Sequence, residues 1–254
     1  MPISAFKYVF IHPNYPYSFK LDWELEDPIL VGDYHFTIQR SESVEGPWET
    51  VTTQDNTLFY EDIYYYTSKE SRIYYRILGE DPAGVYFESE PKNLYRTLGD
   101  KNYITFKRIQ AKETLLYTKK TGIEIDFYRR KTLGNSCSVC IDEVTNQPLK
   151  ANCSNCYGTG VEGGYCSPVR LYALLEDKNV STAITDFGLS EDCQSIVRSI
   201  AYPLLHKWDI LKTVEDNRRF VVESIQYIYV RTSPVIQVMG VNQVSKTSSE
   251  YCLP

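Results

Sequence analysis

The stretch Cys137-Ser-Val-Cys140, followed after a gap of twelve residues by Cys153-Ser-Asn-Cys156-Tyr-Gly158-Thr-Gly160, decides how the middle of this chain folds. Four of the seven cysteines fall here, as two Cys-x-x-Cys pairs. A pair at this spacing puts two sulfurs on one tight turn, and two facing turns supply the four thiolates of a tetrahedral zinc site. Gly158 and Gly160 follow the second pair, where such a turn needs a positive φ. The sequence therefore predicts a structural Zn²⁺ ion with four ligands: Cys137, Cys140, Cys153 and Cys156.

Two other interpretations of these cysteines stay open. Two disulfides would use the same residues but leave the doubled spacing unexplained. A redox Cys-x-x-Cys pair normally occurs singly, at the start of a helix that follows a strand, and neither pair is predicted there. Four thiolates leave no open coordination position, so the predicted metal stabilises structure and does not catalyse. The other cysteines, Cys166, Cys193 and Cys252, are expected to be reduced thiols without a role.

The cysteine segment is predicted to be an excursion from a β domain. Alternating apolar residues predict a strand over 123–130 before it and another over 169–175 after it. A Thr-Asn-Gln-Pro turn signal at 145–148 predicts that the segment between the two cysteine pairs folds back as a hairpin. Further strands are predicted over the ranges 194–202, 219–230 and 235–244. We expect a compact meander that forms a small barrel or sandwich.

The first 97 residues alternate apolar and polar positions in short runs separated by turn residues. Strands are predicted over 18–23, 34–40 and 72–78, the last with Ile73, Tyr75 and Ile77 facing inward, so this part is predicted to be an antiparallel sandwich.

A linking helix is predicted to follow the sandwich. It should be capped by Asp100, run from about Lys101 to Lys119 and end at Gly122. We interpret it as an amphipathic helix lying on another surface, with a solvated interdomain linker as the alternative. Its basic residues are interpreted as a solvated face rather than a nucleic-acid patch: Lys101, Lys107, Arg108, Lys112, Lys119 and Lys120.

The predicted fold is mainly β, in three units. These are an amino-terminal sandwich over 1–97, the linking helix over 98–121, and a carboxy-terminal small barrel or sandwich over 122–254. The four-cysteine zinc hairpin is inserted into the third unit at 133–166.

Composition limits the range of partners. The formal net charge of −6 argues against broad contact with nucleic acid or an anionic membrane. Between Cys137 and Cys166 the only basic residue is Lys150, which disfavours a zinc-ribbon nucleic-acid binder. We find no signal-peptide pattern and no apolar run of about 18–20 residues, so we expect a protein made in a reducing cytosol, with no membrane partner.

No catalytic motif is present in the sequence. The histidines, His12, His35 and His206, are widely separated, and each is interpreted as structural. There is no glycine-rich phosphate loop, no Gly-x-Ser-x-Gly elbow and no His-Glu-x-x-His pair. We therefore expect a protein that is not an enzyme, without catalytic residues and without an organic cofactor.

Four short motifs of the first unit resemble a fibronectin type III domain. They are Leu21-x-Trp23, Tyr34-x-Phe36-x-Ile38-x-Arg40-Ser41, Gly46-Pro47-Trp48 and Tyr75-Arg76-Ile77. The resemblance implies a sandwich with Trp23 as its core anchor. Ile73 stands where that family usually has a tyrosine, so the family's tyrosine corner is not expected. The likeness implies little about function, because such sandwiches serve as spacers, adhesion modules and decorations.

The rest of the chain resembles structural proteins of tailed-phage virions that carry a zinc-ribbon insertion. The motifs that carry this likeness are Phe127-Tyr-Arg-Arg-Lys-Thr-Leu-Gly-Asn-Ser-Cys137, Asn152-Cys153 with Cys156-Tyr-Gly-Thr-Gly, Trp208-Asp209-Ile210, Arg218-Arg219-Phe220-Val221-Val222, Val235-Ile236-Gln237 and Tyr251-Cys-Leu-Pro254. The closing pattern is similar to head-closure and neck proteins at the portal–tail junction.

That resemblance implies a virion protein assembled in the host cytoplasm. Its expected partners are portal, adaptor, tail terminator or collar proteins and further copies of itself in a ring, with at most incidental contact with packaged DNA. The alternative is a tail or capsid-decorating protein whose fibronectin-like module binds host glycans or other virion proteins.

Overall fold

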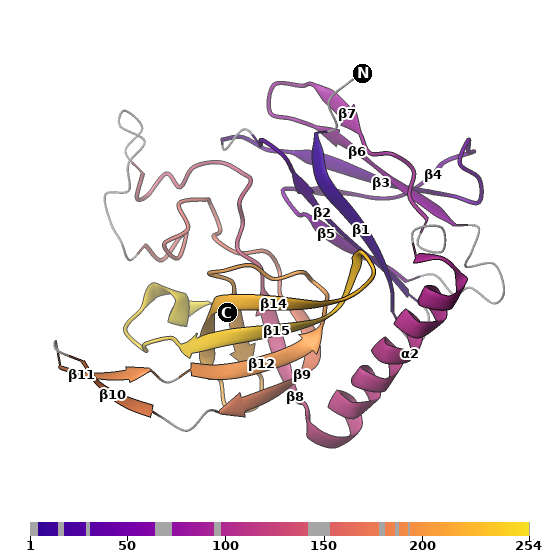
Figure 1. The fold of residues 1–254 in the computed structure, drawn as a ribbon. Helices are drawn as coiled ribbons and strands as arrows, with labels where there is room; N and C mark the ends of the chain where they lie inside the picture. The colour runs from indigo at the N-terminus through magenta and orange to yellow at the C-terminus, as the bar shows by residue number, and fades with distance from the viewer. Residues whose placement is uncertain are drawn as a thin grey trace.

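The structure, a computed structural model, describes residues 5–14, 18–28, 31–63, 73–93, 98–141, 153–177, 181–185, 188–192 and 194–253. Over these residues the fold is mainly β, with a sandwich-like pair of sheets, one long helix and a closed barrel (Figure 1). The predicted fold class is therefore confirmed, including a cysteine cluster inserted between two barrel strands. Among the helices that the structure describes, none has the length and apolar character needed to cross a membrane.

The amino-terminal half consists of two antiparallel sheets. The first has the order β1-β2-β5, formed by Phe6–Asn14, Ser18–Leu25 and Phe59–Asp62. The second has the order β4-β3-β6-β7, formed by Glu49–Asp55, His35–Ser41, Tyr74–Glu80 and Tyr86–Glu88. Trp23 is fully buried, with its ring centroid 5.6 Å from that of Phe36. It is the core anchor that the sequence predicts, and the inward positions Ile73, Tyr75 and Ile77 are buried as predicted.

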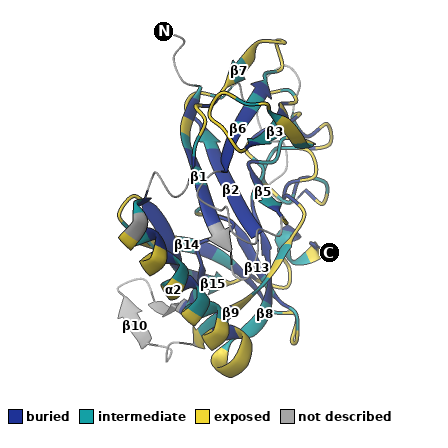
Figure 2. Cartoon of the chain, turned by 90° about the vertical axis from the view of Figure 1, so that its right-hand side faces the viewer, coloured by how far each residue is buried: buried dark blue, intermediate teal, exposed yellow. Residues whose placement is uncertain are grey.

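Strand β2 is buried on both faces. Lys20 and Asp22 lie on the face of β2 opposite to Trp23, yet both side chains are almost completely buried. The barrel covers this face, and the Lys20 ammonium lies 4.3 Å from the centre of the Tyr202 ring. Figure 2 shows β2 among the buried residues at the centre of the molecule. The β1-β2-β5 sheet is therefore a middle layer between the sandwich core and the barrel.

Helix α2, Asp100–Leu116, lies on the surface formed by strands of both halves. It continues as a π-helical turn over Tyr117–Thr121, and the amide of Gly122 donates to the Tyr117 carbonyl oxygen, 3.0 Å away. A Cβ on Gly122 would lie 2.4 Å from that oxygen, so the chain needs glycine here. The N-cap is Gly99, so the prediction that Asp100 caps the helix was wrong by one residue. A well-defined buried face confirms the amphipathic helix: Tyr103, Phe106, Gln110 and Tyr117.

The basic residues of the helix largely form the solvated face that the sequence predicts. Lys107 is half-buried, with its ammonium 5.5 Å from the centre of the Tyr103 ring. The others are exposed: Lys101, Arg108, Lys112, Lys119 and Lys120.

The carboxy-terminal half forms a closed barrel of six strands in the order β12-β15-β14-β13-β8-β9. In that order the strands are Gln194–Ile200, Ser233–Gln243, Arg219–Val230, Ile210–Thr213, Ile123–Tyr128 and Val169–Asp177. The order is not the simple meander that the sequence predicted, because β15 pairs with β12 and β13 pairs with β8. A hairpin of β10, Ser181–Thr185, and β11, Gly188–Asp192, leaves the barrel between β9 and β12, and a 3₁₀ turn over Ser249–Cys252 lies near the end of the chain.

One hydrophobic core joins the predicted units. It contains Trp23 and Phe36 of the sandwich, Phe106 of α2, and Leu133 and Ile236 from the carboxy-terminal half. A second cluster fills the barrel interior around Phe127 and Phe220. The sandwich therefore does not sit on an isolated linker but shares buried surface with the helix and the barrel. The proposed boundaries at 97 and 121 stay a prediction.

Candidate metal centre

The four predicted cysteine ligands lie in the long loop that connects β8 to β9. Isolated β-bridges between Arg130 and Tyr165 and between Ser136 and Val161 hold the two arms of this loop together. Residues 142–152, which include the predicted Thr-Asn-Gln-Pro hairpin, lie outside the described residues. The cysteine segment is thus an excursion between two barrel strands, as the sequence predicts.

The structure brings all four sulfurs together. They lie within 4.8 Å of one another, with 3.8 Å between Cys137 Sγ and Cys153 Sγ and 3.3 Å between Cys140 Sγ and Cys156 Sγ. A tetrahedral ion with Zn–S bonds of about 2.3 Å separates its sulfurs by about 3.8 Å. A disulfide needs about 2.05 Å, so these sulfurs are too far apart to be bonded. The arrangement fits a metal ion and not the disulfide alternative.

The two cysteine pairs sit on two similar turns. The amide of Ile141 donates to the Cys137 carbonyl at 3.1 Å, and the amide of Tyr157 donates to the Cys153 carbonyl at 2.8 Å. Positive φ angles of 50° at Tyr157, 79° at Gly158 and 82° at Gly160 follow the second pair. Gly160 also accepts a 2.8 Å hydrogen bond from the Cys137 amide, which joins the two turns. The glycines therefore have the conformational role predicted for them.

The electrostatics of the cluster favour a bound cation. Backbone N–H groups of Cys156 and Asn155 donate to Cys153 and lower the pKa of its thiol. Burial and the neighbouring sulfurs raise the pKa of the Cys140 thiol. Four thiolates cannot be charged together at this distance without a cation, because like charges repel. A divalent ion at this position would replace the protons and stabilise all four thiolates.

The donor set limits what the centre can do. Four sulfurs in a tetrahedral arrangement suit Zn²⁺ or iron, and the centre has no position left for water or substrate. The four side chains are at most 4% exposed, so the ion would be enclosed. Cys166 lies elsewhere, in a buried cluster with Phe59 and Tyr202, and Cys252 is exposed. Cys193 lies outside the described residues. The site is structural in its chemistry.

A buried ion pair that the sequence did not predict lies at the base of the metal loop. Arg129, the first residue after β8, donates from Nη1 to Asp22 Oδ2 of the sandwich at 2.9 Å. The same oxygen accepts a 3.0 Å hydrogen bond from the Leu204 amide. Both charged side chains are almost completely buried, and the centre of the Phe59 ring lies 5.7 Å from the guanidinium carbon of Arg129. Asp22 of the sandwich thus contacts both the metal loop, through Arg129, and the carboxy-terminal half, through Leu204.

A second buried carboxylate, Asp209, lies near this ion pair. It accepts hydrogen bonds from the amides of Arg130 at 2.7 Å and His206 at 2.6 Å. Burial raises the pKa of Asp209 to about 7 and that of Asp22 to about 6, against the opposing effect of Arg129. The sequence pattern does not predict these contacts, because Asp22 occupies a polar position of an alternating strand, where a solvent-exposed side chain is the usual expectation. We name Asp22, Arg129 and Asp209 the junction triad.

The metal loop is also tied directly to the sandwich. The Gly32 amide donates to the Gly134 carbonyl at 3.2 Å. Asn135 Nδ2 donates to Asp33 Oδ2 at 3.0 Å, and Leu133 belongs to the sandwich core. Ordering of the loop by a metal therefore also fixes the contact between the two halves of the molecule.

The three histidines occupy separate places. His35 is exposed, and its Nδ1 lies 2.6 Å from Asp55 Oδ1. His206 is half-buried, and burial lowers its pKa to about 4. His12 is fully buried against Phe106, with ring centroids 6.1 Å apart. Neither nitrogen of His12 has a hydrogen-bond partner in the part of the chain that the structure describes. His12 is therefore a source of instability within the fold.

Replacing His12 with phenylalanine should raise the free energy of unfolding by about 1–2 kcal/mol, because phenylalanine buries no unsatisfied nitrogen. Burial lowers the pKa of His12 to about 3, so on acidification the unfolded chain takes up a proton that the folded chain does not. The wild type therefore loses stability as the pH falls from about 6.5 toward 3, and the variant should lose less. Urea denaturation at about pH 7 and about pH 4.5 measures both effects.

The exposed His35 provides the matched control for this substitution. His35→Gln should bring no gain at neutral pH, because the side chain is already in solvent. An unchanged acid dependence in the His12→Phe variant would contradict the assignment.

Comparison with protein-family models gave no match, and comparison with curated protein sequences gave no relative. Function must therefore be inferred from the residues and geometry of this chain.

Proposed function

We propose that this chain is a structural protein of a tailed-phage virion and forms part of the neck or connector between portal and tail. In this proposal Zn²⁺ occupies the cluster of Cys137, Cys140, Cys153 and Cys156. The observation that carries the proposal is a closed four-sulfur centre in a long loop, on a molecule that consists of a β-sandwich and a β-barrel. Such a centre shapes a contact surface and offers nothing to a substrate, which favours assembly over catalysis.

The rigidity of the body supports a role in assembly. The junction triad and the shared core hold the sandwich, metal loop and barrel in one arrangement. A ring of identical subunits closes only if two different surfaces of one subunit keep a fixed relative angle. A subunit whose sandwich, metal loop and barrel keep one relative arrangement meets that requirement.

Exposed apolar residues near the metal loop supply candidate contacts. Val139, between the first two cysteines, is 57% exposed, and Trp208 is 47% exposed. Trp208 has a φ of 77°, an unfavourable conformation for a non-glycine residue. Its carbonyl accepts a 3.3 Å hydrogen bond from the Tyr165 hydroxyl of the metal loop. Strained, exposed aromatic residues are often functional, and tryptophan is enriched among residues that dominate interface energy.

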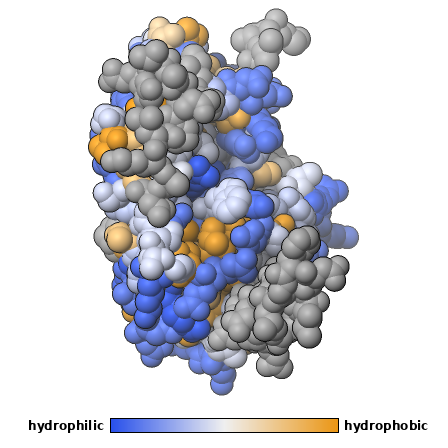
Figure 3. Space-filling model, turned by 90° about the vertical axis from the view of Figure 1, so that its left-hand side faces the viewer, coloured by the Kyte–Doolittle hydropathy of each residue, from blue (hydrophilic) through white to orange (hydrophobic). Residues whose placement is uncertain are grey.

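The proposed partners are portal, adaptor, tail terminator or collar proteins and further copies of this chain. Figure 3 shows hydrophobic residues in limited areas among hydrophilic ones on the part of this face that is coloured. Docking should depend on a few anchors such as Trp208, and the protein can remain monomeric before assembly.

A binding experiment with purified proteins tests the neck assignment. The zinc-loaded chain should bind portal protein, and Trp208→Ala should weaken this binding about tenfold or more, corresponding to about 1.4 kcal/mol. Tyr86→Ala is the matched control, since Tyr86 is 76% exposed at the far end of the sandwich. Binding to tail or capsid protein without binding to portal would contradict the proposal.

The alternative function is a tail or capsid-decorating protein whose sandwich binds host glycans or other virion proteins. The observation in its favour is the exposed pair Val85 and Tyr86 at the start of the short strand β7. In that case Tyr86→Ala should abolish binding to the host glycan or virion protein, and Trp208→Ala should not. The same two variants therefore separate the two functions.

A further inference from the structure

The amino-terminal strand β1 is an edge strand that borders a groove. It pairs only with β2 in the described sheet order, whereas the barrel strands have no free edge. The groove has a volume of about 460 Å³ and lies along three consecutive residues of β1, Val9, Phe10 and Ile11. That volume falls within the range of about 300–1,000 Å³ typical of ligand sites.

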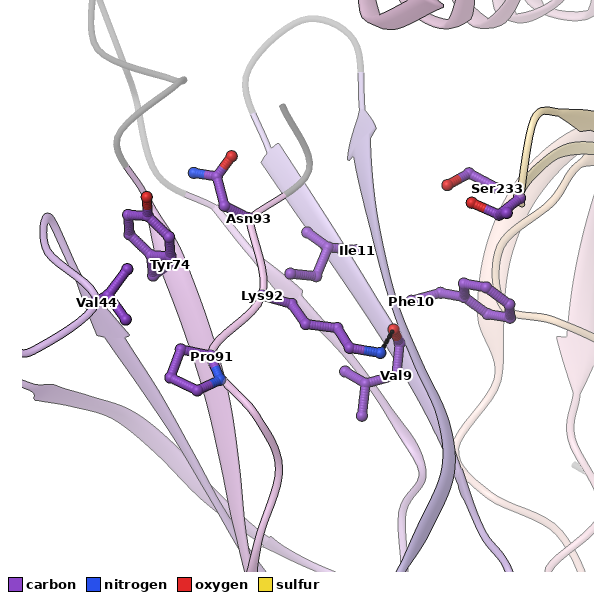
Figure 4. Close-up of a pocket in the computed structure, with 10 residues that line it drawn as sticks. Val9, Phe10, Ile11, Val44, Tyr74, Pro91, Lys92, Asn93 and Ser233 are labelled. Atoms are coloured by element: carbon purple, nitrogen blue, oxygen red, sulfur yellow. Dashed lines mark hydrogen bonds between the residues drawn. The ribbon is translucent and has the colours of Figure 1, made fainter. Parts of the chain in front are cut away.

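The opposite wall of the groove is a short segment around Lys92. Lys92 exchanges backbone hydrogen bonds of 2.9 Å with Tyr75 in an isolated bridge, so this segment is joined to β6 on one side and faces β1 on the other. Val44 and Tyr74 of the sandwich also line this side of the groove. Thr232 and Ser233, at the start of β15, line it near Phe10 (Figure 4). The groove thus separates two extended backbones that do not pair with each other.

Lys92 crosses this groove, as Figure 4 shows. Its ammonium donates to the Val9 carbonyl oxygen at 3.2 Å, on the side of β1 where the described strands provide no pairing partner. Burial lowers the pKa of the ammonium, and the nearby charge of Glu90 acts in the opposite direction. Glu90 is exposed, and among the described residues no carboxylate forms an ion pair with Lys92. A half-buried cation with one hydrogen-bond partner has donors to spare for an anionic group.

We propose that this groove binds an extended acidic peptide segment of a partner protein, which pairs with the edge of β1 and places a carboxylate on Lys92. In this mode the main-chain hydrogen bonds give affinity, and alternate side chains give specificity. The apolar side chains of the segment would lie against Tyr74 and Val44. The proposal goes beyond the neck assignment, because it concerns the outer edge of the sandwich and needs neither the metal loop nor Trp208.

Labelled hexapeptides of alternating valine and threonine, with a single glutamate at each position in turn, are suitable probes. Six residues span roughly 20 Å when extended, which exceeds the three residues of β1 in the groove. At least one probe should bind the zinc-loaded full chain with a Kd below about 1 mM. Its binding should protect the amides of β1 from hydrogen exchange, and replacement of its glutamate by glutamine should weaken it about tenfold.

Lys92→Met should weaken binding of the same probe about tenfold, whereas Lys7→Met should leave it unchanged. Lys7 is the matched control because it lies on β1, the strand that the probe should pair with, but is exposed and paired with Glu24 at 3.2 Å. Circular dichroism checks that both variants are folded.

Three results would overturn the proposal. The first is that no probe binds at about 1 mM. The second is binding that is insensitive to Lys92→Met or that protects amides outside β1. The third is that the Lys92→Met variant self-associates and the wild type binds no peptide. The role of Lys92 would then be to prevent edge-to-edge aggregation of this chain.

Discussion

Replacing Cys153 and Cys156 with serine should remove one bound metal ion per chain and unfold the loop between β8 and β9. Among the described residues, the buried cluster in the middle of this loop consists of the four cysteines, with Ile141 packed against them. Metal binding to four-thiolate sites contributes about 10 kcal/mol or more to folding, and one partly buried isoleucine cannot replace it. The loop should therefore become accessible to protease.

Elemental analysis and limited proteolysis measure this result. The wild type should contain about one zinc per chain, and its midpoint of thermal unfolding should rise with free zinc concentration. Cys252→Ser is the matched control, since Cys252 is an exposed thiol outside the cluster, and it should change neither readout. A wild-type chain that purifies without metal and whose loop resists protease would disprove the metal centre.

Arg129→Met should destabilise the protein by about 3–5 kcal/mol, the second large effect expected. The substitution leaves Asp22 as an uncompensated charge that is 0% exposed between sandwich and barrel. An exposed pair serves as the control: Lys7→Met removes the partner of Glu24 and should cost less than about 1 kcal/mol. Urea denaturation of the two variants compares these costs directly.

The pH dependence of Arg129→Met follows from Asp22. Burial already raises the pKa of Asp22 to about 6, and loss of the guanidinium should raise it further. A carboxyl whose folded pKa exceeds its unfolded value binds a proton more readily in the folded chain, so stability falls as the pH rises through this interval. The variant should therefore be less impaired at about pH 5 than at about pH 8. Adding Asp22→Asn should restore stability at the higher pH, and a failure of this rescue would show that packing rather than charge causes the loss.

The parts of the fold that follow local rules were predictable. Alternation located Ile73, Tyr75 and Ile77, and doubled Cys-x-x-Cys spacing located the four ligands, because both signals depend on residues close in sequence. The junction triad was not predictable in this way. Asp22 and Arg129 are 107 positions apart and meet only because the barrel covers the outer face of β2.

The strand order was missed for the same reason. A meander is the simplest path through consecutive strands, yet the chain between β12 and β13 crosses the barrel end, so β15 returns to β12 and β13 pairs with β8. The cap at Gly99 was missed because Asp is the commoner capping residue, whereas here the backbone conformation with a φ of 71° suits glycine.

The placement of the metal loop between two neighbouring strands also bears on how quickly the chain can fold. Strands β8 and β9 must meet across residues 129–168, and the entropy lost on closing a loop grows with its length. An ion bound to Cys137 and Cys156 would bring the ends of that segment together beforehand, so the strands would search a smaller volume before they pair. The distant pairing of β13 with β8 is slow for the same reason, while the β14–β15 hairpin needs only local contacts. We therefore expect metal supply to affect the rate at which newly made chains close their barrels, in addition to the stability of the finished protein.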